Sequence, residues 1–173
     1  IDPASILLMT FTRRSAEEML HRAEELLGNR CDRVTGGTFH SFANTILRRY
    51  AKLLGFANSF TILDRGDSED VINLIRSRLG LDKKERRFPR KNTIMEIVSL
   101  AANKTCGVAA IVDEQFPHLL NELDELSQIA ESYRSYKLER SLLDYDDLLT
   151  HLRDLLRNHP QVAERLSNTF RYI

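Results

Sequence analysis

Apolar residues along this chain first follow two strand–helix units, one directly after the other. The run from Ile6 to Thr10 and the run from Arg33 to Gly37 have the length of buried strands, and apolar residues at helical spacing follow each. The residues expected to face the core are Ala16, Met19, Leu20, Ala23 and Leu27 in the first helix, and Phe39, Ala43, Ile46, Leu47, Tyr50 and Leu54 in the second. Two such units predict a parallel sheet with helix N-termini along its C-terminal edge.

The pattern becomes mainly helical beyond Gly55. After a short extended piece at Phe60–Asp64, helical spacing recurs near residues 71–79, 94–101, 109–114, 119–140 and 144–156. A last short helix precedes Phe170–Ile173, an apolar segment that is expected to be the start of another strand. Capping boxes at Ser15 with Glu18 and at Thr93 with Glu96, and a cap at Asp144, are expected to start three of the helices. The predicted fold is therefore α/β and rich in helices.

Composition adds few constraints. The 25 basic and 25 acidic residues balance, so any surface that binds nucleic acid has to be local. The two isolated cysteines, Cys31 and Cys106, fit a reducing compartment such as the cytoplasm; a disulfide stays possible, but buried free thiols are favoured. No apolar run reaches transmembrane length, so no membrane partner is expected. The chain opens without Met, and both ends are expected to be cuts through a larger protein.

Thr38, His40 and Ser41 lie where the second predicted strand turns into a helix. Helix N-termini carry free N–H groups and partial positive charge, and so favour phosphate, while the glycines at Gly36–Gly37 would let a bulky anion approach. On this stretch alone, a turn with an N-cap hydroxyl and a structural histidine is the favoured interpretation. A Ser–His catalytic pair is disfavoured because no nucleophile elbow or orienting acid accompanies it.

Three segments, in order along the chain, carry a resemblance to UvrD/Rep/PcrA-type superfamily 1 DNA helicases. Motif Ia is resembled by TFTRRSAEEM (residues 10–19), motif Ib by GTFHSF (37–42), and an LDFDDLL-type motif by LDYDDLL (143–149). The segment 88–104 also resembles part of the helical insertion of that family. The resemblance implies a partial RecA-like parallel sheet with an all-helical insertion. Residues 1–55 would belong to domain 1A, residues 56–140 to the insertion 1B, and residues 141–173 to the return into domain 1A.

The same resemblance implies a surface that binds single-stranded DNA. Phe11 and Tyr145 would face bases, although a core phenylalanine and a surface tyrosine are the alternatives. The residues expected at the DNA backbone are Thr10, Thr12, Arg14, Thr38, His40 and Ser41, whereas Arg13 departs from the asparagine that is frequent in the family. The implied function is the DNA-binding part of an ATP-dependent helicase, usually moving 3′ to 5′, in repair or replication. The alternative is a helical protein-interaction module that does not bind DNA.

The nucleotide-binding motifs of such a helicase are absent from this sequence. It contains no G-x-x-x-x-G-K-[ST], and the true Asp-Glu of Walker B is expected beyond Phe170–Ile173. Asp113 and Glu114 resemble Walker B but lie in the insertion and are expected to be surface acids. No catalytic, cofactor or metal residue is therefore assigned; Asp144, Asp146 and Asp147 are interpreted as structural.

The parent protein would use ATP and Mg²⁺, and its partners would be single-stranded DNA, the junction with duplex and the remaining helicase domains. The basic stretch Lys83–Lys91 is either a solvated loop or a phosphate contact.

Overall fold

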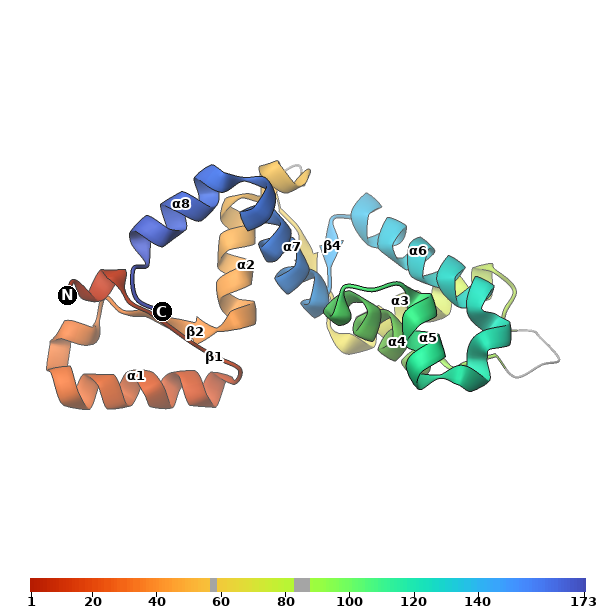
Figure 1. Ribbon diagram of the computed structural model, residues 1–173, viewed down its shortest axis with the longest axis horizontal. Helices are drawn as coiled ribbons and strands as arrows, with labels where there is room; N and C mark the ends of the chain where they lie inside the picture. Colours follow the sequence, from red (N-terminus) through yellow and green to blue (C-terminus); the bar gives the residue numbers. More distant parts are fainter. Residues whose placement is uncertain (57–58, 83–87) are drawn as a thin grey trace. The chain divides into compact units, whose positions relative to one another are not determined.

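The computed structural model describes residues 1–56, 59–82 and 88–173 (Figure 1). The chain divides into two compact units. Unit 1 comprises Ile1–Ala57 with His151–Ile173, and unit 2 comprises Asn58–Thr150. The described residues form many helices and two small parallel sheets, as expected for a helix-rich α/β chain.

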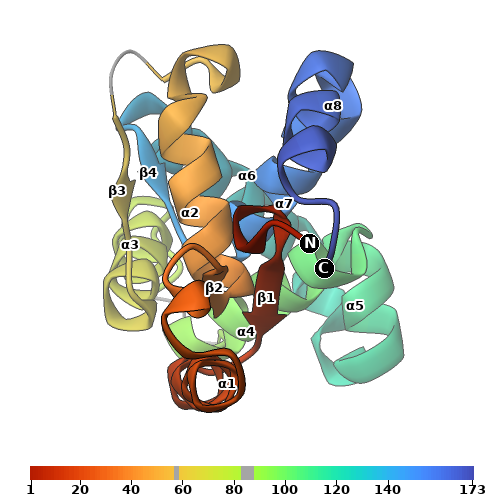
Figure 2. The same cartoon turned by 90° about the vertical axis from the view of Figure 1, so that its left-hand side faces the viewer.

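The sheet of unit 1 pairs strands β1 (Leu7–Thr10) and β2 (Thr35–Thr38) in parallel, with Leu7 opposite Thr35 and Thr10 opposite Thr38 (Figure 2). Near the C-terminus, Tyr172 forms a parallel bridge with Ile6, and its carbonyl accepts a 2.9 Å hydrogen bond from the N–H of Leu7. The apolar end of the chain therefore lies alongside the first strand, where the sequence predicted the beginning of a strand.

Helices cover both faces of this small sheet. Helix α1 (Arg13–Leu27) packs on one face, while α2 (Phe39–Arg49) and α8 (Pro160–Thr169) lie on the other (Figures 1 and 2). Three short 3-10 helices belong to the same unit: η1 (Pro3–Ser5) precedes β1, η2 (Gly28–Cys31) links α1 to β2, and η3 (Ala51–Leu54) follows α2. The buried side chains of α2 are those of Ala43, Ile46 and Leu47, which follow the predicted apolar face.

Several sequence-based details of unit 1 are wrong. Met19 is exposed, because α1 presents only a narrow stripe to a sheet of two strands. Thr12, and not Ser15, caps α1 by accepting a hydrogen bond from the Ser15 N–H at 3.1 Å. Cys31 is buried and free as expected, but Cys106 of unit 2 is free and exposed. The expectation for Leu27 concerns a side chain outside the described part.

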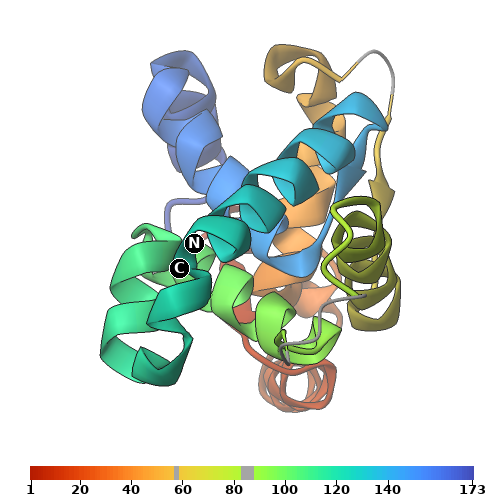
Figure 3. The same ribbon diagram turned by 90° about the vertical axis from the view of Figure 1, so that its right-hand side faces the viewer.

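Unit 2 is a helical cluster with a second parallel strand pair, β3 (Thr61–Ile62) and β4 (Leu142–Leu143). Its helices are α3 (Arg65–Arg78), α4 (Lys91–Lys104), α5 (Val108–Gln115) and α6 (Leu123–Glu139), with the 3-10 helix η4 (Pro117–Glu122) before α6 (Figure 3). They enclose a core whose fully buried members include Ile72, Ile94, Ile97, Ile111, Leu126, Ile129 and Tyr133. The expected capping box at Thr93 is wrong, since α4 begins after Arg90 without a side-chain cap.

Helix α7 (Tyr145–Asn158) begins in unit 2, and its last residues belong to unit 1. As predicted, Asp144 starts it: Asp144 Oδ1 accepts a bond from the Asp147 N–H, and Asp147 Oδ2 accepts one from the Asp144 N–H, each at 2.9 Å. Within the described ranges, no single helix is long and apolar enough to cross a membrane; the bent pair α4 and α5 meets that test only when the two are counted together.

Candidate nucleic-acid interface

The register of the sheet in unit 1 brings the two predicted junctions side by side. Thr10 and Thr38 are direct partners at the ends of β1 and β2, so the residues that follow each strand leave the same edge of the sheet. Both strands lead into helices, α1 and α2, whose N-termini therefore lie at this edge. The carboxyl ends of parallel strands are where open α/β sheets bind ligands.

Threonine hydroxyls close the first turn of both helices. Thr12 Oγ1 accepts a hydrogen bond from the Ser15 N–H, and Thr38 Oγ1 accepts one from the Ser41 N–H, both at 3.1 Å. Ser41 Oγ accepts from the Thr38 N–H at 2.9 Å and donates to the Thr38 carbonyl at 2.8 Å. These side chains are thus engaged in capping bonds, which fix where the free N–H groups of each helix point. A phosphate contact through the Ser41 hydroxyl would have to replace one of these bonds.

The two glycines of β2 serve the protein itself. A Cβ on Gly36 would come within 2.7 Å of the Leu20 side chain of α1, and a Cβ on Gly37 within 2.7 Å of Ser41 Oγ. Gly36 therefore lets α1 pack closely on the sheet, and Gly37 leaves room for the Ser41 cap. These contacts explain why a side chain is excluded at both positions; that an anion approaches the glycine backbone stays a prediction.

An aromatic pair stands at the shared edge. The side chain of Phe11 is 85% exposed, and its ring centroid lies 5.3 Å from that of Phe39, with the ring planes tilted by 41°. The expectation that Phe11 is not a core residue therefore holds. Phe39 was assigned only to the helix face by the sequence. Phe39 also packs against the ring of Phe11. The sequence carries a signal for this contact, because each of the paired threonines, Thr10 and Thr38, is followed directly by phenylalanine.

Charge distinguishes this edge from the equivalent edge of unit 2. The first turns of α1 and α2 contain no acidic residue, and Arg14 is exposed in the first turn of α1. In unit 2, the helices after β3 and β4 are capped by Asp64 and Asp144 instead. An acid in the first turn neutralises the partial positive charge of a helix N-terminus, whereas an arginine adds to it. The edge of unit 1 therefore favours an anion.

Tyr145 lies in unit 2, where its side chain is 51% exposed on the first turn of α7. The acids around it are held by the protein, as the structural interpretation predicted. Asp144 Oδ2 accepts hydrogen bonds from Tyr133 Oη at 2.9 Å and Lys137 Nζ at 2.6 Å, and Lys137 Nζ lies 2.5 Å from Asp147 Oδ2. Asp146 accepts bonds from the Ser99 hydroxyl and the Asn103 amide of α4, at 2.6 and 3.0 Å. The first turn that carries Tyr145 is thus tied to α4 and α6.

Burial and charge act against each other in this cluster. Burial raises the pKa of Asp144, but the Lys137 ammonium group and the hydrogen bonds from Lys137, Asp147 and Tyr133 outweigh it, and the pKa lies below its usual range. At Asp147 burial dominates with the help of the Asp144 charge, and its pKa is raised. Burial, followed by the Asp144 charge, also raises the pKa of Tyr133.

The Walker B-like acids and the basic stretch belong to unit 2, and part of that stretch lies outside the described residues. Asp113 and Glu114 are exposed on α5, and Glu114 Oε2 forms a 2.7 Å ion pair with Lys104, which lowers the pKa of Glu114. Of the basic stretch, residues 83–87 lie outside the described part, while Phe88 packs on the core of unit 2 and Lys91 pairs with Asp70 at 2.6 Å. In the described part of the chain, no cluster of His, Cys, Asp or Glu has an arrangement that could hold a metal ion.

Comparison with known proteins shows the family to which this chain belongs. A family model described as the UvrD/REP helicase N-terminal domain matches residues 1–173. The chain is 28% identical over 173 residues to the ATP-dependent DNA helicase PcrA of Staphylococcus aureus, and 32% identical over 176 residues to that of Staphylococcus epidermidis. Each alignment covers 100% of this chain and 23% of the relative. The chain therefore spans about a quarter of the length of these relatives.

Proposed function

Because this chain belongs to the UvrD/REP helicase N-terminal domain family, we propose that it forms part of an ATP-dependent DNA helicase and supplies a surface that binds single-stranded DNA. The relatives named above are described as ATP-dependent DNA helicases. Within the proposed enzyme, unit 1 would belong to domain 1A, and unit 2 would form most of the helical insertion 1B. The division of the chain into two compact units supports this assignment.

The observation that carries the proposal is the pairing of Thr10 with Thr38. It places two helix N-termini and the rings of Phe11 and Phe39 at one edge of one sheet. Single-stranded nucleic acid offers flat bases and charged phosphates in alternation, and proteins bind it with aromatic platforms beside positive charge. The edge of unit 1 combines both features within a few residues.

Each side chain at this edge has a distinct role in the proposal. Phe11 presents an exposed ring for stacking on a base, and Phe39 packs against that ring. Arg14 contributes positive charge to phosphate, with Thr10 and His40 beside the strand ends. Thr12, Thr38 and Ser41 hold the helix starts in place through their capping bonds. Tyr145 would offer a second aromatic contact from unit 2.

ATP and Mg²⁺ would be bound by motifs that this sequence does not contain, and other parts of the proposed helicase would supply them. We further propose that the helicase moves in the 3′ to 5′ direction and acts at a junction between single and double strands. It would serve repair or replication. The alternative function is a helical interaction module that does not bind DNA. The acid-free first turns of α1 and α2 favour the DNA-binding function over it.

Fluorescence anisotropy of a labelled oligo(dT) tests the proposal directly. We expect the 173-residue chain to bind the single strand with an affinity that falls steeply as salt is raised, because phosphate contacts release counterions. The variant Arg22→Gln serves as a control, since Arg22 is exposed on α1 but lies two helical turns away from the edge and pairs with Glu18. Absence of binding at low salt by a folded chain would favour the interaction module.

A further inference from the structure

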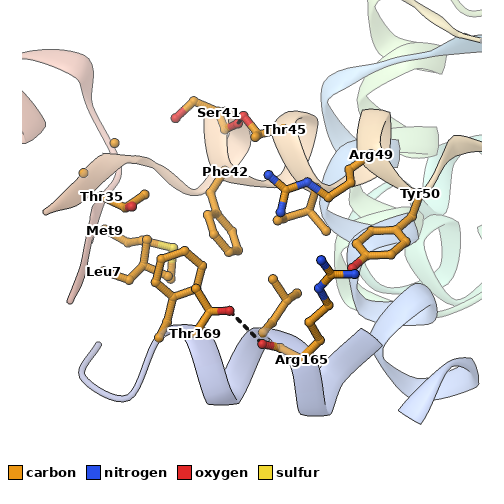
Figure 4. A pocket seen from close by; sticks show the side chains of 15 residues that line it. Leu7, Met9, Thr35, Ser41, Phe42, Thr45, Arg49, Tyr50, Arg165 and Thr169 are labelled. Carbon is orange, nitrogen blue, oxygen red and sulfur yellow. Dashed lines mark hydrogen bonds between the residues drawn. The ribbon is translucent and has the colours of Figure 1, made fainter. Parts of the chain in front are cut away.

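A pocket of about 410 Å³ opens on the face of the unit 1 sheet that carries α2 and α8 (Figure 4). Leu7, Met9 and Phe42 give it an apolar floor, while Arg49 of α2 and Arg165 of α8 reach into it from opposite sides. None of the residues that line this pocket is acidic. Ser41 of the proposed DNA-binding edge lines it, but Phe11, Phe39 and Arg14 do not.

The two arginines have no counter-ion among the described residues. Neither guanidinium group forms an ion pair or a hydrogen bond with any residue in the described ranges. The two positive charges converge on one cavity and repel each other slightly, and no negative charge among the described residues offsets that repulsion. A bound anion would turn this arrangement into a favourable one, because guanidinium groups donate paired hydrogen bonds to phosphate oxygens.

Tyr50 provides an independent observation at the same place. Its side chain lines the pocket, and its hydroxyl oxygen is buried without a hydrogen-bond partner among the described residues. Buried hydroxyl groups are nearly always hydrogen-bonded in proteins, and those that are not call for an explanation such as a ligand. Figure 4 places this hydroxyl at the end of the pocket to which the Arg165 side chain extends.

We propose that this pocket binds a phosphomonoester that carries a flat or apolar body. A phosphomonoester has a charge between about −1.5 and −2 near neutral pH, which matches two arginines better than a single carboxylate would. The Tyr50 hydroxyl would donate a further hydrogen bond, and the floor of Leu7, Met9 and Phe42 would cover the body. A free mononucleotide and the terminal phosphate of a DNA strand both present this chemistry.

Isothermal titration calorimetry of the 173-residue chain tests the pocket, with deoxyadenosine monophosphate as the probe and deoxyadenosine as the uncharged comparison. We expect the monophosphate to bind at least tenfold more tightly than the nucleoside. Arg49→Gln and Arg165→Gln should each weaken its binding about tenfold or more, and Tyr50→Phe should weaken it severalfold. Arg157→Gln is the matched control: it removes the same charge from the last turn of α7, as Arg49→Gln does from α2, but away from the pocket.

Oligonucleotides with and without a 5′-terminal phosphate identify the source of the ligand. If only the phosphorylated strand displaces the mononucleotide, the pocket is a site for strand ends. If neither strand displaces it, the ligand is a free nucleotide. Circular dichroism confirms that each variant is folded. The proposal is overturned if neither the mononucleotide nor the phosphorylated strand binds at millimolar concentration, or if Arg49→Gln and Arg165→Gln bind as tightly as Arg157→Gln. Oligo(dT) binding that persists in Arg49→Gln but is lost in Phe11→Ala would leave the proposed function standing in either case.

Discussion

Replacing Phe11 by alanine should separate DNA binding from folding. The side chain is 85% exposed, so folding buries only about 30 Å² of an aromatic side chain of roughly 200 Å². At about 25 cal/mol per Å², that burial contributes about 0.8 kcal/mol, and an exposed ring contact with Phe39 adds about 0.5 kcal/mol. We therefore expect the free energy of unfolding to fall by only about 1 kcal/mol.

The effect on DNA should be larger and of a different kind. Stacking of a base on an aromatic ring contributes roughly 1–3 kcal/mol, which corresponds to a loss of affinity of roughly 5- to 150-fold. Phe11 carries no charge, so the slope of log affinity against log salt should stay the same. Anisotropy titrations of a labelled oligo(dT) with the proposed full-length helicase at several salt concentrations measure both quantities, and urea unfolding measures the stability.

Two further variants make the result decisive. Leu26→Ala removes a side chain that is 83% exposed on α1 and should leave DNA affinity unchanged. Phe39→Ala should cost less affinity in the Phe11→Ala background than in the wild type, because Phe39 acts by supporting the Phe11 ring. Unchanged DNA affinity in folded Phe11→Ala protein would refute the stacking role, and so would a loss that appears equally in Leu26→Ala.

The other predictions concern charged residues. Arg14→Gln should reduce the salt slope of oligo(dT) binding by about one; an unchanged slope would mean that Arg14 does not touch phosphate. Glu114→Gln in the proposed full-length helicase should leave ATP turnover near normal, since Glu114 is an exposed partner of a surface lysine, whereas a loss of about a hundredfold would place it in the nucleotide site. Lys137→Met leaves the buried carboxylates of Asp144 and Asp147 without their cation and should lower the free energy of unfolding by about 3–5 kcal/mol at neutral pH. In the wild type, the lowered pKa of Asp144 means that its stabilisation is complete above its ordinary value of 3.8 and is lost as pH falls below it. The raised pKa of Asp147 offsets part of that loss, and urea midpoints between about pH 5 and pH 3 check the sign.

Local chemistry in the sequence was sufficient to predict most elements of the chain. Apolar runs of four or five residues followed by helical spacing indicated β1 with α1 and β2 with α2, and both junctions lie at the edge where such strands were expected to end. Asp144 could be recognised as a cap because capping depends on residues three positions apart. The same rule misplaced the start of α1 at Ser15, because Thr12 offered a competing hydroxyl one turn earlier.

Only the tertiary structure decided which distant residues share a surface. The pairing of Thr10 with Thr38 brings Phe39 into contact with Phe11, and no local pattern fixes the register of two strands that are about 25 residues apart. Contacts across the fold also assigned Gly36 to the packing of Leu20, and left Arg49 and Arg165 facing one pocket from different helices. Hydrophobic periodicity is a local property of the sequence, so the sequence alone determines which face of each element is buried. The partners of that face depend on how the elements pack, and that is set by side-chain shape and strand register across the whole unit.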